Sequence, residues 1–151
     1  MSRRPNKVPK HLRDRVINRR KGEVDAPPLF FRLFVPHQLV GTNEILSAMN
    51  KSRHVYNGLK KQQEGLVSNS LIGKHRVKTP VNATLTWKVY WKDRHDPINL
   101  YGAQKFIFDA LVSRGVLPDD DKRGVLNLNH VYEEVREKKE AGVDILLETI
   151  F

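Results

Sequence analysis

The sequence lacks cysteine entirely, although it is 151 residues long. Disulfide bonds, thiolate nucleophiles and cysteine-ligated zinc are therefore excluded, and a cytoplasmic setting is expected. Apolar residues never run long either, since no stretch approaches the ~20 consecutive apolar residues of a membrane-spanning helix. The basic beginning of the sequence is not followed by an apolar core, so it does not resemble a secretory signal. We expect a protein that works outside the membrane.

Several catalytic patterns are also missing. The six histidines show neither H-x-H nor H-E-x-x-H spacing, so a histidine-ligated zinc site is not expected. The stretch LIGKHR around Gly73 lacks the pattern of a nucleotide-binding P-loop, and serine and threonine occur without a triad-like setting. Hydrolysis through a histidine, cysteine or serine centre therefore finds little support.

Acidic residues are outnumbered in this chain. There are 27 Lys and Arg against 17 Asp and Glu, which gives a formal net charge of +10. A surface with this excess attracts anionic partners, of which nucleic acid is the first candidate and a membrane surface the second. The apolar fraction of 39% is sufficient for one core, and the length fits one domain.

The positive charge is concentrated at the beginning of the sequence. Residues 1–26 hold nine Lys and Arg against three Asp and Glu, with almost no large apolar residues. We therefore divide the chain into a basic N-terminal arm, 1–26, and a folded domain, 27–151. The arm is either a solubilising or targeting tail, or an extension that tracks phosphates without sequence specificity. In the second case its DNA contacts come from Arg3, Arg4, Arg19, Arg20 and Lys21.

Apolar alternation predicts the strands of the domain. The stretch PPLFFRLFVP, residues 27–36, places Phe31 and its alternate neighbours on one side. The strictest alternation runs through TPVNATLTWKVYWKDR and places Trp87 and Trp91 on the core face. Two further strands are predicted in GVLNLNHVYEE and GVDILLETIF, joined by the charged turn VREKKEAG.

Two helices are predicted between these strands. The first lies somewhere in 51–66, after a loop, and the second in NLYGAQKFIFDALVSRG, where Gly115 acts as the C-terminal cap. The apolar stripe of the second helix is formed by Leu100, Ala103, Ile107, Ala110 and Leu111. The fold class is therefore α+β: a single domain with a mixed β-sheet and two main helices packed on one face.

Carboxylates flank the second predicted helix. Asp96 follows the best strand, and Asp119, Asp120 and Asp121 follow the helix. If the chain folds back across the top of the sheet, the two groups converge and offer oxygen ligands of the kind that Mg²⁺ prefers. Clustered carboxylates on a basic surface would otherwise repel DNA.

Simpler interpretations remain open for the same residues. The three consecutive aspartates suit a solvated turn, and Asp96 suits the N-cap of the helix that follows it. Lys105 stands four residues before Asp109, so the two side chains suit an ordinary ion pair on the helix surface.

The same stretch resembles a known signature. Residues 94–121, RHDPINLYGAQKFIFDALVSRGVLPDDD, resemble the motif of the RusA family of Holliday junction resolvases, approximately R-x-D-x-D-N-L, a spacer, K, then x-x-x-D-A-L-x-x-x-G-x-L-x-D-D. The flanks agree, with Asn43 shortly after a Pro-containing first strand and an alternating apolar strand at 142–150. The resemblance covers roughly residues 28–150 and leaves the basic arm unexplained.

The resemblance implies a RusA-like fold and a homodimeric, Mg²⁺-dependent endodeoxyribonuclease, with Mn²⁺ as a substitute ion. The implied partner is branched DNA, above all the four-way junction, which is cut by paired symmetric nicks in recombination and repair inside a bacterium or a phage-infected cell. The implied catalytic residues are Asp96, Lys105 and Asp120; the metal ligands are Asp96, Asp119, Asp120 and Asp121; and further DNA contacts come from Asn43, Arg94 and Asn99.

One position departs from the family pattern. Ile98 stands where the family has its second Asp, which removes a candidate metal ligand. The alternative is therefore a catalytically weakened or inactive RusA-like protein that binds DNA or regulates. An RNA-binding accessory protein is a second rival, but no aromatic RNP-like motif accompanies it.

Overall fold

A computed structural model describes residues 30–36, 39–73, 75–93, 96–119 and 123–150 of the chain. The basic arm at 1–26 and its predicted DNA contacts therefore lie outside the described residues, as do Arg94, Asp120 and Asp121. The described elements are, in order, β1 (Phe30–Pro36), α2 (Thr42–Lys51), α3 (Arg53–Ser70), β2 (Val81–Tyr90), α4 (Pro97–Tyr101), α5 (Gln104–Ser113), β3 (Val125–Val135), the 3-10 turn η1 (Lys138–Glu140) and β4 (Gly142–Thr149).

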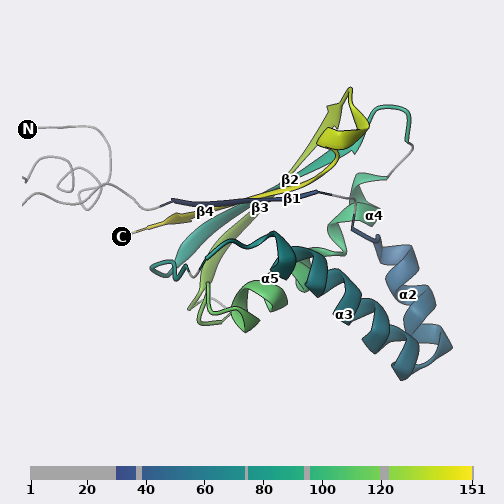
Figure 1. Cartoon of the computed structure of the whole chain (residues 1–151), viewed down its shortest axis with the longest axis horizontal. Helices are drawn as coiled ribbons and strands as arrows, with labels where there is room; N and C mark the ends of the chain where they lie inside the picture. The colour runs from purple at the N-terminus through teal and green to yellow at the C-terminus, as the bar shows by residue number, and fades with distance from the viewer. Residues whose placement is uncertain (1–29, 37–38, 74, 94–95, 120–122, 151) are drawn as a thin grey trace, which may run out of the picture.

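The strands form one mixed sheet, seen nearly edge-on in Figure 1. Their order is β1-β4-β2-β3. β4 pairs antiparallel with both β1 and β2, whereas β2 and β3 are parallel neighbours. Although η1 joins β3 directly to β4, the two strands are not neighbours, because β2 lies between them. The connection from β2 to β3 runs through α4 and α5, as parallel strands require a crossover.

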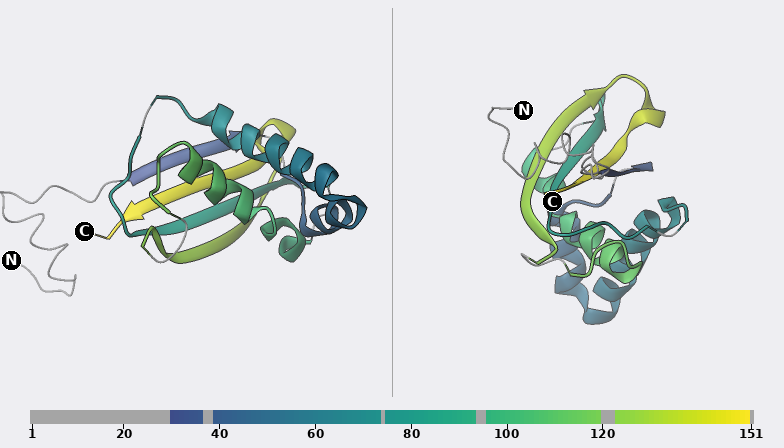
Figure 2. Two further views of the ribbon diagram at one scale, coloured as in Figure 1. Left: turned by 90° about the horizontal axis from the view of Figure 1, so that it is seen from below. Right: turned by 90° about the vertical axis from the view of Figure 1, so that its left-hand side faces the viewer.

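The helices cover one face of this sheet, as Figure 2 shows from two sides. The alternation of β1 and β2 is confirmed, since the buried side chains of both strands fall at every second residue. Ile107 and Leu111 of α5 are fully buried against that face, with Leu85 and Trp87 of β2 in the same core. The predicted α+β class, with a mixed sheet and helices on one face, is confirmed.

The described residues contain more helices than predicted. The expected loop before the first helix is itself helical, because α2 occupies Thr42–Lys51 and α3 begins again after Ser52, whose side chain accepts a hydrogen bond from the Val55 N–H at 3.0 Å. The second region divides at Gly102 into α4 and α5. Gly115 follows the end of α5 with φ of 78°, as expected of a glycine cap.

The predicted burial of Trp91 is wrong. Trp87 has no exposed surface, but 45% of Trp91 is exposed. β2 ends at Tyr90, and this end of the sheet rises beyond the helical layer (Figure 1), so the inward side of Trp91 has no helix to meet. Among the described helices, none combines the length and the apolarity needed to cross a membrane.

Candidate functional site

Asp96 begins the helical crossover. It is the N-cap of α4, and its Oδ1 accepts a hydrogen bond from the backbone N–H of Ile98 at 3.0 Å. Pro97 stands at the first helical position, where its missing N–H costs nothing. The capping role is therefore confirmed for Asp96. Asp96 is exposed to solvent, and it follows the carboxyl end of β2.

The structure brings together two of the residues that the family resemblance singles out. The Asn99 Oδ1 accepts a hydrogen bond from the backbone N–H of Asn43 at 2.8 Å, and the Asn99 carbonyl accepts one from the Thr42 hydroxyl at 3.1 Å. Gly41 allows this approach, because a Cβ there would overlap the Asn99 side chain. The start of α2 and the start of α4 thus form one polar surface together with Asp96; we call it the carboxyl-end surface.

Lys105 makes the ion pair that its helical spacing predicted. Its Nζ lies 3.0 Å from Asp109 Oδ1, while 63% of the lysine side chain is exposed. Asp109 also lies 3.7 Å from Lys60 of α3, and Lys60 is 3.4 Å from Glu64. The nearby carboxylates, first of all Glu64, raise the pKa of Lys60 above its ordinary value.

Asp119 lies at the other end of the sheet. Asp119 lies in the loop before β3, and Gly124 is the last residue of that loop. The Gly124 carbonyl accepts a hydrogen bond at 2.9 Å from the backbone N–H of Val81, the first residue of β2. A Cβ on Gly124 would overlap the Asp119 carbonyl, so the two residues are in close contact. The Asp119 carboxylate lies 2.9 Å from the Arg123 guanidinium. We call this region the amino-end surface.

Within one chain, Asp119 therefore does not converge with Asp96 as expected. Asp96 follows the carboxyl end of β2 and Asp119 lies beside its amino end, and a strand of ten residues is ~30 Å long. No three His, Asp or Glu side chains in the described ranges lie close enough to hold a metal ion. Within the described residues of a single chain, Asp96 and Asp119 therefore do not meet at one site.

Ile98 occupies an outward position on α4. Its side chain is 77% exposed, although it is a large apolar residue. The missing family carboxylate would thus have stood on the solvent side of the carboxyl-end surface, next to Asp96. Asp93, the nearest upstream carboxylate, is also exposed, and its backbone N–H donates to the Tyr90 carbonyl at 2.9 Å in the turn after β2.

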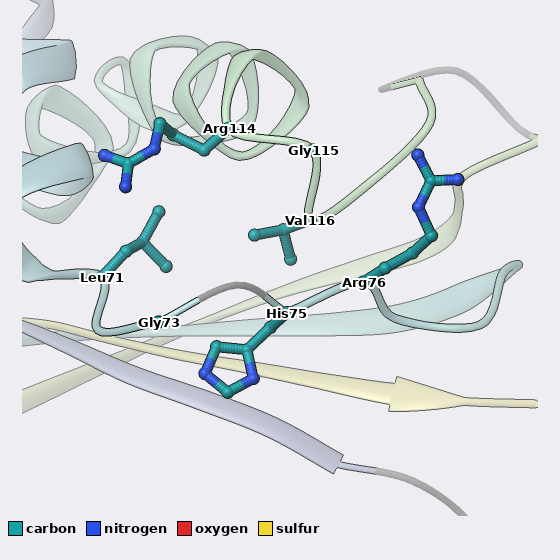
Figure 3. Close-up of a pocket in the computed structure, with 7 residues that line it drawn as sticks. All are labelled: Leu71, Gly73, His75, Arg76, Arg114, Gly115 and Val116. Atoms are coloured by element: carbon teal, nitrogen blue, oxygen red, sulfur yellow. The ribbon is translucent and has the colours of Figure 1, made fainter.

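A cavity of about 360 Å³ opens at the amino-end surface (Figure 3). One lining cation contacts a helix end: Arg114 donates to the Ser68 carbonyl at 3.0 Å, near the last turn of α3, and α5 also ends here. In Figure 3 the guanidinium groups of Arg76 and Arg114 lie on opposite sides of the cavity and do not converge. Because helix C-termini carry partial negative charge, Arg114 offsets that charge at the end of α3.

A partly buried histidine cluster joins the crossover to the sheet, and sequence reasoning missed it. The Trp87 indole N–H donates to His130 Nδ1 at 3.0 Å, and an indole nitrogen cannot accept, so the proton of neutral His130 resides on Nε2. That nitrogen donates to Gln104 Oε1 at 2.9 Å, and the Tyr101 ring stacks on the imidazole with centroids 4.2 Å apart. Burial lowers the pKa of His130 below its ordinary value. The inward alternation of Leu128, His130 and Tyr132 was the available signal.

Comparison with known proteins adds no family: no family model matches the chain, and no curated protein does.

Proposed function

We propose that this chain is a RusA-like, Mg²⁺-dependent endodeoxyribonuclease that binds branched DNA, with the four-way junction as its substrate. The observation that carries the proposal is the hydrogen bond between Asn99 and Asn43, because it assembles two residues of the resemblance beside Asp96 on one exposed surface. The net charge of +10 supports an anionic partner.

The separation of Asp96 and Asp119 shapes the rest of the proposal. In a homodimer whose two-fold axis is perpendicular to the strands, the strands of the two protomers run in opposite directions. The carboxyl-end surface of one protomer then lies beside the amino-end surface of the other. In such a homodimer, Asp96 of one chain and the aspartates at 119–121 of the second chain share one cation. Two equivalent sites follow from the symmetry, which suits paired nicks on a junction that itself has two-fold symmetry.

Each residue then has a distinct role. Asp96, Asp119, Asp120 and Asp121 would hold Mg²⁺ through their carboxylate oxygens, and the chemistry supplied there would be Lewis-acid assistance at the scissile phosphate. Lys105 stabilises negative charge that develops on the phosphoryl oxygens. Its pair with Asp109 is exposed, and such pairs contribute only about 0.2–0.5 kcal/mol, so a phosphate can compete for the ammonium group.

Mixing two inactive variants tests both the activity and the shared site. Asp96→Asn and Asp120→Asn should each lower Mg²⁺-dependent nicking of a synthetic four-way junction by about 10²-fold or more, while binding persists. Refolding the two variants together should restore about a quarter of the wild-type sites, because half of the dimers then contain one intact pair. The products are single nicks, read on denaturing gels.

Asp93→Asn is the matched control, since it removes a neighbouring exposed carboxylate that is not a proposed ligand, and it should retain activity. Failure of the mixture to recover nicking, with dimers present by analytical ultracentrifugation, overturns the shared site. Full nicking by Asp120→Asn alone overturns the assignment of that residue.

A non-catalytic RusA-like DNA-binding protein is the second candidate. The exposed Ile98, in place of a family carboxylate, favours it. Tight junction binding with no cleavage at any Mg²⁺ or Mn²⁺ concentration supports this candidate, and an Ile98→Asp variant that gains cleavage would link the loss to that one side chain.

A further inference from the structure

Trp91 is an exposed aromatic residue that the core does not use. It follows β2 directly, and its backbone N–H donates to the Val135 carbonyl at 3.0 Å, so its position at the rim of the sheet is well defined. With 45% of its surface exposed, it is the accessible one of the two tryptophans, because Trp87 is completely buried.

Two cations from different segments lie over the exposed ring. The Lys92 Nζ and the Arg136 guanidinium carbon each lie 5.3 Å from the Trp91 ring centroid. The carboxylates nearest to them in the chain, Asp93 and Glu137, form no ion pair with either cation among those found in the described residues. The charges of Lys92 and Arg136 thus remain available to an anion beside the ring.

We propose that Trp91, Lys92 and Arg136 form a stacking platform for an unpaired base of branched DNA. The base takes the place of the cations over the ring, and the two long cationic side chains swing aside to contact the adjoining phosphates. This inference rests on the proposed DNA partner and adds which part of the DNA is recognised. An aromatic face offers a base an attractive contact whatever its sequence, and cations beside it follow the backbone. Paired bases in a duplex do not present their faces, so the platform selects branch points and single strands.

The location agrees with this role. Trp91 stands five positions before Asp96, and both follow the carboxyl end of β2. A second copy of the chain is a poorer occupant, because two such platforms would bring Lys92 and Arg136 against their own counterparts.

Intrinsic fluorescence tests the platform with Trp87 as an internal control. Titrating the wild-type protein with a four-way junction or a single-stranded oligothymidylate should quench the Trp91 emission and reduce its access to acrylamide. A blunt linear duplex, at the same salt concentration, should quench it far less. Trp91→Phe should remove the DNA-dependent change and leave only the constant emission of Trp87.

Affinity measurements give the second readout. Trp91→Ala should weaken binding to the junction by about 5- to 100-fold with little change on the blunt duplex, since stacking on one base contributes that much. Ile72→Ala, which removes another exposed apolar side chain away from the platform, should bind as the wild type does.

The outcomes separate a failure of the proposed function from a failure of the platform alone. Wild-type protein that binds no DNA overturns the proposed function as well as the platform. Wild-type protein that binds the junction with no change in Trp91 emission, or with equal quenching by blunt duplex, overturns the platform alone. Emission that changes with protein concentration in the absence of DNA assigns Trp91 to an interface between copies and also overturns the platform.

Discussion

The two ends of β2 lie beside opposite ends of helices, and side chains of opposite charge contact those helix ends. At the carboxyl-end surface a helix begins, and a carboxylate, Asp96, caps it; at the amino-end surface two helices end, and Arg114 contacts the last turn of one of them. The helix dipole accounts for both choices, because N-termini favour anions and C-termini favour cations. Asp96 and Arg114 thus already bond to the backbone, and only their remaining hydrogen-bonding atoms are available to a ligand.

The contacts that build the two surfaces also differ. The carboxyl-end surface is built from segments far apart in the sequence, as the Asn43–Asn99 bond illustrates, and it lies at the same end of the sheet as the platform of Trp91. At the amino-end surface the Asp119–Arg123 ion pair is local, four residues apart. The contact of the Asn99 side chain thus joins distant segments, whereas the Asp119–Arg123 pair lies within the loop before β3. The Arg114–Ser68 and Val81–Gly124 bonds nevertheless tie the amino-end surface to distant segments as well.

The largest expected effect comes from adding a methyl group at either end. A Cβ at Gly102 would overlap Thr42, and one at Gly124 would overlap the Asp119 carbonyl. Gly102→Ala and Gly124→Ala should each lower the free energy of unfolding by about 1–3 kcal/mol, because neither site has room for the extra group. Denaturant unfolding measures this loss.

Amide hydrogen exchange then separates the two ends. Gly102→Ala should speed exchange at the Asn43 amide, and Gly124→Ala at the Val81 amide, each without the other. Gly58→Ala is the matched control, since nothing lies within 4 Å of its added methyl group on α3, and it should stabilise by about 0.5–1 kcal/mol. Loss of protection at both amides in both variants would show that the two ends are not independent.

A smaller effect is expected from acid, and it should act near the carboxyl-end surface. Because the folded state lowers the pKa of His130, the unfolded chain takes up this proton more readily. The free energy of unfolding is therefore greatest above the ordinary histidine pKa of about 6.5 and decreases as the pH falls below it. Protonation also abolishes the acceptor for Trp87, a hydrogen bond worth about 0.5–1.5 kcal/mol.

His130→Gln should flatten this dependence between pH 7.5 and 5.5, measured by urea unfolding at each pH. Tyr132 on the same strand does not compete in this range, because burial raises the pKa of its phenol. A wild-type and a variant protein with parallel pH profiles would contradict the assignment to His130.

The smallest effect belongs to the amino-end surface. Arg114→Ala should lower the free energy of unfolding by about 0.3–1 kcal/mol, the usual contribution of a cation at a helix C-terminus, and the loss should shrink as salt is added. Arg114→Lys should recover part of it. A loss that is insensitive to salt would indicate packing of the arginine stem instead.

The sequence predicted best what depends on periodicity. Alternation placed the buried side of β1 and β2 correctly, and the spacing of Ile107 and Leu111 placed the inward face of α5. It predicted poorly what depends on where a layer ends: Trp91 continues the alternation, but the helical layer stops before it.

The candidate site shows the same division. The cap at Asp96 and the Lys105–Asp109 pair follow from local spacing, and both are found. The bond from Asn99 to Asn43 joins distant segments, so no local pattern reveals it. The cluster around His130 also joins distant segments, and only the alternation of β3 pointed to the inward position of the histidine. The distance between Asp96 and Asp119 was equally hidden, because it depends on β2 and β3 being parallel.

The position of β4 constrains the order of assembly during synthesis. β1 and β2 share no hydrogen bonds, and each pairs with β4, which comes after all the other described strands in the sequence. A ribosome-bound chain that has not yet released residues 142–149 therefore holds a β2–β3 pair and a solitary β1. The sheet closes only when this late segment slides between its two neighbours, so a peptide of that sequence should rescue a chain cut within the preceding turn.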